Sequence, residues 1–477
     1  MSKANKYLVV ELDETLIKSD MLYETFWSAF SKNFLIPIKS IFYLIFGKAN
    51  LKFYLGNLSK VDIKTLPYNN IVIDYINSHK SKGGKVALIT SSNQKVAFQI
   101  ANYLNIFDEV HGSSNNKNLK GKEKVEFLNK RFGIKNYDYL GNYFIDIEIC
   151  KYANKIITID ASNYLKSKFN ETNINCSYLI SEKKVNSIYS FLKAIRPYQW
   201  LKNSLIFLPI IAAHKINNLL IADSLFAFFA FSFIASSVYL INDLLDLKAD
   251  RKHLKKNKRP FASGELPMKI GHLGGFSIFV IGIIFGLKIG ITFLLILLIY
   301  FSITIAYSIY FKKKTIIDIF ILSLLYTIRI IGGGVATNTN ISFWLLAFSV
   351  FIFLSLAAIK RQSELVDLIS QGKSKMTGRG YFINDLTFIS SLALGTGLLA
   401  NLVIILYINT PKVISLYSNP EYLWGACFLL LFWIIHMCFK TNRGEMHYDP
   451  IIFAIKDKLS ISIIFAIFSF VIMASKI

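Results

Sequence analysis

Three aspartates and an asparagine are grouped where a long apolar stretch ends and a basic segment begins: Asn242, Asp243, Asp246 and Asp250. On a helix, positions 243, 246 and 250 fall within about 60° of one face, so the three carboxylates can converge. Mg²⁺ takes carboxylate oxygens and shares its other positions with substrate phosphates. Acids at the mouth of a membrane helix are costly unless they bind something, so this group favours a magnesium-diphosphate site over a solvated helix end.

The composition indicates a membrane protein with a soluble N-terminal part. The chain has 477 residues, 53% of them hydrophobic, and a mean hydropathy of +0.43. Short apolar runs alternate with polar segments up to residue 187, and long apolar segments dominate afterwards. We therefore predict a soluble domain over 1–187 and an integral membrane domain over 188–477. The N-terminus shows no cleavable signal peptide, because its first apolar run is broken by Glu11 and Asp13.

Hydropathy predicts nine membrane spans, and charge predicts their orientation. The spans lie near residues 200–214, 221–243, 270–289, 291–311, 315–337, 341–359, 385–408, 420–439 and 459–477. Lysine and arginine concentrate in the loops after the second, fourth, sixth and eighth spans. The positive-inside rule then places the soluble domain and the aspartates on the cytoplasmic side of the cell (inner) membrane.

The net charge of +24 is explained by the same basic loops, which face anionic lipid headgroups and phosphorylated substrates. Nucleic acid is therefore not expected as a partner. The four cysteines form no CxxC pair, and we assign them no disulfide, metal or catalytic role.

The segment from Asn242 to Pro260 reads NDxxDxxxDRxxxxxxxRP, which resembles the first aspartate motif of the UbiA superfamily of intramembrane prenyltransferases. In that superfamily nine helices surround a cavity open to the lipid, and Mg²⁺ bridges the aspartates to a substrate diphosphate. The resemblance implies an all-α membrane domain that binds Mg²⁺ through Asp243, Asp246 and Asp250. It also implies that Arg251 and Arg259 bind substrate phosphate.

A second stretch, from Arg196 to Asn203, reads RPxQWxKN and resembles the decaprenyl-phosphate phosphoribosyltransferase branch of that superfamily. Members of that branch use a sugar diphosphate donor. The resemblance implies that Lys202 and Asn203 position the donor together with Asn242. Arg196 and Gln199 would bind its phosphates.

The segment from Lys360 to Leu365 lies where ordinary prenyltransferases of the superfamily carry a second aspartate motif. Here Lys360 and Arg361 precede Glu364, so the site has fewer acids and more cations. A donor with an additional phosphate, such as phosphoribosyl diphosphate, accounts for this change, and a solvated basic loop is the alternative. We assign these three residues to substrate phosphate binding.

Polar residues around the fourth and fifth spans extend the pattern. Tyr307 and Lys312 resemble a YxxxxK stretch of the same branch, which adds Lys312 to the phosphate-binding residues. Arg329 lies inside an apolar span, so we expect it to face a polar cavity and pair with an acid or a phosphate. The glycines 332–334 predict a close helix approach or a break in the span.

Four stretches of the soluble domain resemble, in order, the motifs of haloacid dehalogenase (HAD) phosphatases. The resemblance implies an α/β Rossmann-like sheet with helices on both faces and a helical cap at about residues 20–60. The apolar composition of the cap region also suits contact with a membrane. The implied site residues are Glu11, Asp13, Thr90, Lys124 and Asp146.

Two acids of this HAD-like site are altered. Glu11 replaces the nucleophilic aspartate, and one added methylene moves the attacking oxygen by about 1 Å, which can cost ~10²-fold in rate. Asn142 replaces the first acid of the fourth motif. The domain is therefore either a specialised phosphatase acting on the transferase product or a non-catalytic module.

Together these features predict a membrane transferase that moves 5-phosphoribosyl from phosphoribosyl diphosphate to a polyprenyl phosphate in cell envelope biosynthesis. The first alternative is a prenyltransferase that joins an isoprenyl diphosphate to an aromatic acceptor, as in quinone synthesis. The second is a non-enzymatic membrane scaffold.

Overall fold

The computed structural model describes residues 6–114, 118–141, 147–160, 167, 175–179, 186–253, 255–376, 378–446 and 449–475. The chain forms two compact units. Unit 1 comprises Met1–Ile195 and Tyr239–Gly275, and unit 2 comprises Arg196–Val238 and Phe276–Ile477. The segment that carries the aspartates is thus part of the same unit as the N-terminal residues.

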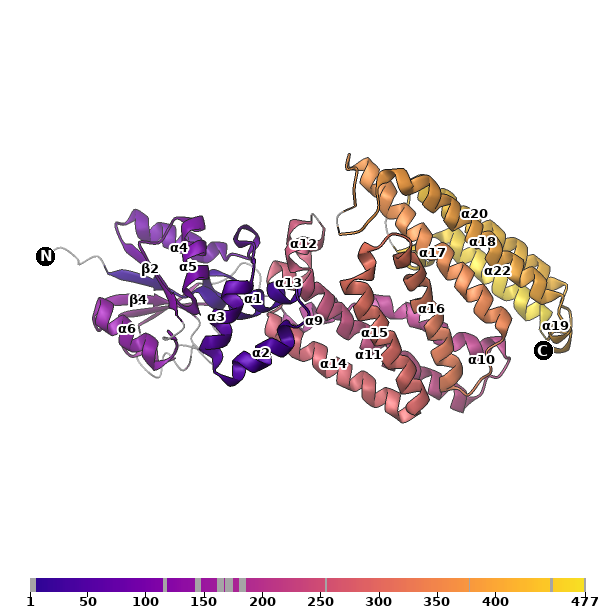
Figure 1. The fold of residues 1–477 in the computed structure, drawn as a ribbon, viewed down its shortest axis with the longest axis horizontal. Coiled ribbons are helices and arrows are strands. Elements are labelled where there is room, and N and C mark those ends of the chain that lie inside the picture. The colour runs from indigo at the N-terminus through magenta and orange to yellow at the C-terminus, as the bar shows by residue number, and fades with distance from the viewer. Residues whose placement is uncertain are drawn as a thin grey trace. The chain divides into compact units, whose positions relative to one another are not determined.

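A parallel sheet of six strands forms the centre of unit 1, in the order β3-β2-β1-β4-β5-β6 (Figure 1). The strands are β1 (Tyr7–Val10), β2 (Lys85–Asn93), β3 (Glu109–Ser113), β4 (Tyr137–Leu140), β5 (Lys155–Ile159) and β6 (Cys176–Leu179). Leu8 and Val10 of β1 face a core shared with α4 (Asn70–Ser81) and α5 (Gln94–Leu104). Val9 faces the opposite core, which includes α6 (Lys122–Phe132). Both faces are covered, as parallel sheets require, and the Rossmann-like prediction is confirmed.

Shorter helices complete unit 1. Three of them follow β1 in the predicted cap region: α1 (Met21–Phe30), α2 (Ile36–Ile45) and α3 (Lys48–Leu58). The Asp20 side chain caps α1 by accepting a hydrogen bond from the Leu22 backbone N–H. The remainder are α7 (Ile147–Cys150), α9 (Ser187–Ile195), α12 (Leu247–Lys252) and α13 (Pro260–Ser263).

Seven helices of the described chain are long and apolar enough to cross a membrane. They are α11 (Asn218–Leu245), α14 (Met268–Ile289), α15 (Ile291–Ile309), α16 (Ile317–Ala336), α17 (Phe343–Ser370), α18 (Leu386–Ile408) and α20 (Tyr422–Asn442). The pair α21 (Pro450–Lys456) and α22 (Lys458–Ala474), bent by 86°, is an eighth span if the two count as one. A short helix, α19 (Pro411–Leu416), lies between α18 and α20.

The span predicted at 200–214 is not a long α-helix. Residues Pro197–Phe207 form a 3₁₀ helix that leads into the five-residue α10 (Leu208–Ala212). Hydropathy detected the apolar composition, but it does not report this tighter backbone geometry. The 3₁₀ helix holds Lys202 and Asn203 in buried positions.

Candidate functional site

The aspartates lie in unit 1, at the break between the end of α11 and the start of α12. The helix α11 ends at Leu245, and Asp246 has a non-helical backbone before α12 begins. Asp243 and Asp250 are buried, and one nitrogen of Arg259 bridges them, at 3.0 Å from Asp243 Oδ1 and 2.6 Å from Asp250 Oδ2. Burial raises the pKa of Asp250, as does the neighbouring Asp243, while Arg259 opposes them. The group is therefore built to hold positive charge.

Asp246 has a non-helical backbone, but the Asp246 N–H still donates to the Asn242 carbonyl and the Asp250 N–H to the Asp246 carbonyl, both at 2.9 Å. Convergence of all three aspartates on one metal ion stays a prediction. Within the described residues no group of three or more acids, histidines and cysteines is placed to hold a metal ion. The residues present do fit a shared magnesium site. Asp243 and Asp250 converge on one cation, and the buried Asn242 Oδ1 has no hydrogen-bond partner. One or two carboxylates with substrate phosphates are the usual Mg²⁺ ligands.

Arg251, next to Asp250, binds the cap of unit 1. Its guanidinium donates two hydrogen bonds to Glu24 of α1, at 3.1 Å and 2.6 Å, and one to the Ala262 carbonyl at 3.2 Å. The side chains of Arg251 and Glu24 are only 6% and 4% exposed. The Ser19 hydroxyl donates a further bond of 2.7 Å to Glu24. Arg251, predicted to bind phosphate, is thus occupied by a buried ion pair.

A second contact joins α12 to the same domain. The ammonium groups of Lys252 and Lys248 lie 2.7 Å and 3.6 Å from Asp62 Oδ2. The hydrogen bond from Lys252 is the main reason why the pKa of Asp62 lies below its usual value. The helix that carries Asp250 is therefore tied to the HAD-like half through two acids.

Unit 2 contains a cluster of two lysines and one acid. Lys202 Nζ and Lys360 Nζ both contact Asp449 Oδ2, at 2.8 Å and 2.9 Å. Burial alone would raise the pKa of Asp449, but the two ammonium groups lower it below its usual value. Two cations share one carboxylate, so the three groups together carry one excess positive charge.

Asn203, beside Lys202, is fixed by neutral and cationic partners. Its Nδ2 donates to the Ser232 hydroxyl at 2.9 Å, and its Oδ1 accepts from Arg329 Nε at 2.7 Å. Arg329 also donates to the Tyr300 hydroxyl at 2.8 Å and to the Leu325 carbonyl. Among the described residues Arg329 thus pairs with a carboxamide and other neutral groups, so the expected acid is not its partner, and pairing with a substrate phosphate stays a prediction.

Arg361 lies at the centre of a buried network of ion pairs and hydrogen bonds. Its side chain is fully buried; Nε donates to Asp318 at 2.6 Å, Nη1 to Glu364 at 2.5 Å, and Nη2 to the Tyr307 hydroxyl at 3.0 Å. Arg379 Nε also reaches Glu364, at 3.3 Å. The structure thus brings Tyr307 to Arg361 and Glu364, which the sequence had singled out in a different segment. Their polar atoms are turned toward one another.

The other predicted phosphate-binding residues of unit 2 are half-buried. Arg196 has a left-handed backbone just before the 3₁₀ helix, and Gln199 lies in its first turn. Lys312 lies in a 3₁₀ turn, Phe311–Lys313, after α15.

In the HAD-like centre, Glu11 is held by a buried cation. Lys124 forms an ion pair with Glu11 Oε2, and the Tyr139 hydroxyl donates to the same oxygen at 3.1 Å. Lys124 also donates to Tyr139 at 2.8 Å, and its side chain is 1% exposed. The carboxylate at the nucleophile position is thereby engaged on one oxygen by both partners.

The second acid, Asp13, is also fixed. It accepts hydrogen bonds from the Met21 backbone N–H at 2.8 Å and from the Ser92 hydroxyl at 2.6 Å. Burial, with Asp20 nearby, raises the pKa of Asp13 to about 7. Thr90 is buried and accepts from the Ser92 N–H at 3.1 Å. Asn142 and Asp146 lie outside the described residues.

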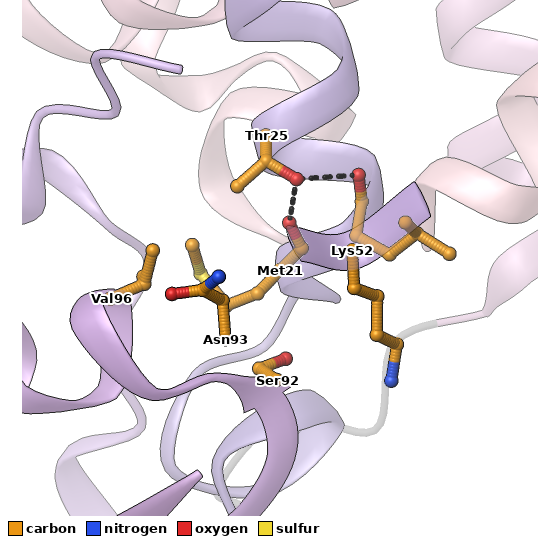
Figure 2. A pocket seen from close by; sticks show the side chains of 7 residues that line it. Met21, Thr25, Lys52, Ser92, Asn93 and Val96 are labelled. Carbon is orange, nitrogen blue, oxygen red and sulfur yellow. Dashed lines mark hydrogen bonds between the residues drawn. The ribbon is translucent and has the colours of Figure 1, made fainter. Parts of the chain in front are cut away.

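A small pocket lies between the cap and the sheet (Figure 2), and two of its lining residues, Met21 and Ser92, donate hydrogen bonds to Asp13. It is lined by Met21, Leu22, Thr25, Lys52, Ser92, Asn93 and Val96. Lys52 Nζ donates to the carbonyl and the hydroxyl of Ser91, at 2.8 Å and 2.9 Å, and burial lowers its pKa. The pocket thus combines an apolar wall with one partly buried amine.

Residues 205–453 match the UbiA prenyltransferase family, and the chain belongs to this family. It is an integral membrane protein with a Rossmann-like N-terminal domain, which is consistent with the HAD resemblance. The uncharacterized protein y4nM of Sinorhizobium fredii is 33% identical over 95% of this chain and 88% of its own. The nodulation protein NoeC of Azorhizobium caulinodans is 32% identical over 57% of this chain and 89% of its own.

The phosphoribosyltransferase branch is also among the relatives. The decaprenyl-phosphate phosphoribosyltransferase of Corynebacterium glutamicum is 33% identical over 43% of this chain and 64% of its own length. The chain is therefore similar to a transferase of the predicted kind over part of its length.

Proposed function

We propose that this protein transfers a 5-phosphoribosyl group from phosphoribosyl diphosphate to a polyprenyl phosphate at the cytoplasmic face of the inner membrane. The observation that carries the proposal is the excess positive charge of Lys202, Lys360 and Asp449. Lys202 comes from the RPxQWxKN stretch and Lys360 from the position of the missing second aspartate motif. A buried cluster with a surplus cation suits an anionic phosphate group beyond the diphosphate.

The acidic group supports the metal part of the proposal. Asp243 and Asp250, with Asn242 and Asp246 beside them, would hold Mg²⁺ and the donor diphosphate. When bound, Mg²⁺ neutralises the charge that develops on the leaving diphosphate. Arg259 already lies between the two carboxylates, where it can contact a phosphate brought to them.

The reaction needs little from the protein beyond positioning. An oxygen of the polyprenyl phosphate bonds to C1 of the ribose, and the bond from C1 to the diphosphate breaks, with the electron pair leaving on diphosphate. The acceptor is already anionic, so no strong general base is required. Lys202 and Asn203 would orient the donor, and Arg329 and Ser232 hold Asn203 in place.

We further propose that the HAD-like domain acts as a positioning module for α12 and not as a phosphatase. Glu11 is paired with Lys124, which opposes nucleophilic attack by its carboxylate. Glu24 and Asp62 bind Arg251 and Lys252, which flank the aspartate group. The domain thereby supports the helix that presents Asp250.

The transfer is tested with membranes that contain the full-length protein, ribose-labelled phosphoribosyl diphosphate and polyprenyl phosphate. We expect label in the lipid extract, and a loss of at least about 100-fold in Asp246→Asn, whose half-buried carboxylate is not one of the Arg259 partners. The control is Asp223→Asn, at the other end of α11. If an isoprenyl diphosphate and an aromatic acceptor react instead, the protein is a prenyltransferase. If neither pair reacts, the scaffold alternative is favoured.

A further inference from the structure

The cap helix α2 presents an unusually apolar surface. Seven large side chains on and beside this helix are each more than half exposed: Phe34, Leu35, Ile38, Ile41, Phe42, Ile45 and Phe46. Soluble proteins rarely expose so many adjacent large apolar groups, and such a patch marks an interaction site.

The helix is nevertheless firmly held in unit 1 by its opposite side. Ile36 is buried with Leu51 and Leu55 of α3, and the rings of Tyr43 and Tyr54 stack with centroids 3.9 Å apart. The exposed face is therefore a fixed feature of the cap, which a partner can cover without rearranging the helix.

The charge around α2 is entirely positive. No Asp or Glu occurs from residue 25 to residue 61, whereas Lys32, Lys39 and Lys48 are exposed within or beside the patch. Apolar side chains flanked by lysines are the composition of helices that lie in the surface of anionic bilayers.

The contacts of the cap within unit 1 also indicate that it lies near the lipid bilayer. Tyr23, Phe26 and Trp27 of α1, the helix before α2, surround His272 in the early turns of α14. Ring centroids lie 6.1–6.5 Å from the imidazole. Since α14 is one of the membrane spans, the cap is attached to the end of a helix that enters the bilayer.

We propose that α2 is a membrane-surface anchor, whose apolar face inserts between headgroups while its lysines contact anionic lipid phosphates. A helix of this kind buries its apolar face about 5–10 Å into the boundary between headgroups and acyl chains. The anchor would hold the HAD-like domain at the membrane whether or not the proposed transfer reaction is correct.

The test places a nitroxide on Ile41→Cys in the full-length protein, after replacement of Cys150, Cys176, Cys427 and Cys438. The protein is reconstituted in nanodiscs containing phosphatidylglycerol. We expect high accessibility to oxygen and low accessibility to a water-soluble nickel reagent. The matched control is Phe98→Cys on α5, which is 53% exposed and should show the opposite pattern. A nitroxide on Ile38→Cys provides a second measurement of accessibility on α2.

Two results would overturn the anchor. Equal nickel accessibility at positions 41 and 98 means that α2 faces water. Shielding of position 41 from both reagents, with dipolar broadening between labels, means that a second copy of the chain covers the patch. Exchange of phosphatidylglycerol for phosphatidylcholine should reduce the depth of the label, because the lysines lose their anionic partners.

Discussion

Arg251 and Glu24, 227 residues apart in the sequence, form a two-point ion pair with almost no solvent exposure. The first belongs to the aspartate segment and the second to the cap of the HAD-like domain. Two nitrogens facing two oxygens fix direction as well as distance, so the pair sets the orientation of α12 against α1.

Glu24→Gln should destabilise the full-length protein by about 3 kcal/mol, because it leaves the Arg251 charge buried without a counter-charge. Thermal unfolding in detergent measures this loss, and the exposed Glu126→Gln on α6 is the control. Combined Glu24→Leu and Arg251→Met should recover much of the stability. An unchanged melting temperature in Glu24→Gln would contradict the proposal that this ion pair positions α12.

Lys202→Met should raise the KM for phosphoribosyl diphosphate by about 10-fold or more, since a charge-assisted hydrogen bond contributes about 1.5–3 kcal/mol. The fold should be retained, because Lys360 still neutralises Asp449. The measurement is steady-state kinetics. The control is Lys288→Met, which removes an exposed lysine of α14 and shows the effect of losing one positive charge elsewhere. Equal KM values for both variants would contradict donor binding by Lys202.

The HAD-like centre should release no phosphate from p-nitrophenyl phosphate with Mg²⁺ above background. Lys124 and Tyr139 both bind Oε2 of Glu11, and this pairing lowers the nucleophilicity of the carboxylate. The comparison is between the wild type and Asp13→Asn, which keeps an oxygen for the Met21 N–H. A release rate that Asp13→Asn abolishes would show that the domain is a phosphatase.

Asp13 should make stability depend on pH in a defined direction. Its pKa is raised from 3.8 to about 7 on folding, so the folded state binds the proton more tightly. Stability from this group is then present below about pH 4 and is lost as pH rises to 7, by at most about 1.4 kcal/mol per pH unit. The stability of Asp13→Asn relative to the wild type should therefore increase as pH rises from about 4 to about 7, measured as the difference between their unfolding midpoints. A difference in unfolding midpoint that does not change with pH would contradict the raised pKa of Asp13.

Gly333→Ala should disturb the 3₁₀ helix that carries Lys202 and Asn203. A Cβ at position 333 would lie 2.1 Å from the Ile206 carbonyl oxygen, which is backbone and has little room to move. We expect a lower melting temperature and reduced transferase activity. Gly395→Ala on α18 is the matched control, because nothing lies within 4 Å of its added Cβ. Similar losses in both variants would point to a general effect of alanine.

Local patterns predicted much of the fold. The apolar run before Glu11 located β1, and the run Val86–Ile89 before Thr90 located β2, because a parallel strand buried on both faces is nearly continuous in apolar residues. Hydropathy located the seven long helices. It failed at 200–214, where composition is apolar but the backbone is 3₁₀. Of the two predictions for the glycines 332–334, close approach of neighbouring segments is confirmed. The alternative, a break in the span, is wrong, because α16 continues through these residues.

The partners of the charged residues could not be predicted in the same way. Glu24 and Asp449 passed unnoticed because ion pairs between distant segments leave no periodic trace in the sequence. One signal was present for Asp449, an acid directly before Pro450 where a short helix starts in a largely basic loop. For Arg251, the family motif suggested phosphate, whereas its neighbour in space is a carboxylate.

The assignment of residues 239–275 to unit 1 has a consequence for biosynthesis. Chains leave the ribosome from the N-terminus, and domains tend to fold in that order. Glu24 is made early, yet its partner Arg251 follows only after α11 has been synthesised. The N-terminal domain therefore completes its contacts only once membrane insertion is under way, which couples the maturation of its cap to the synthesis of α11, the first of the long apolar helices in the described chain.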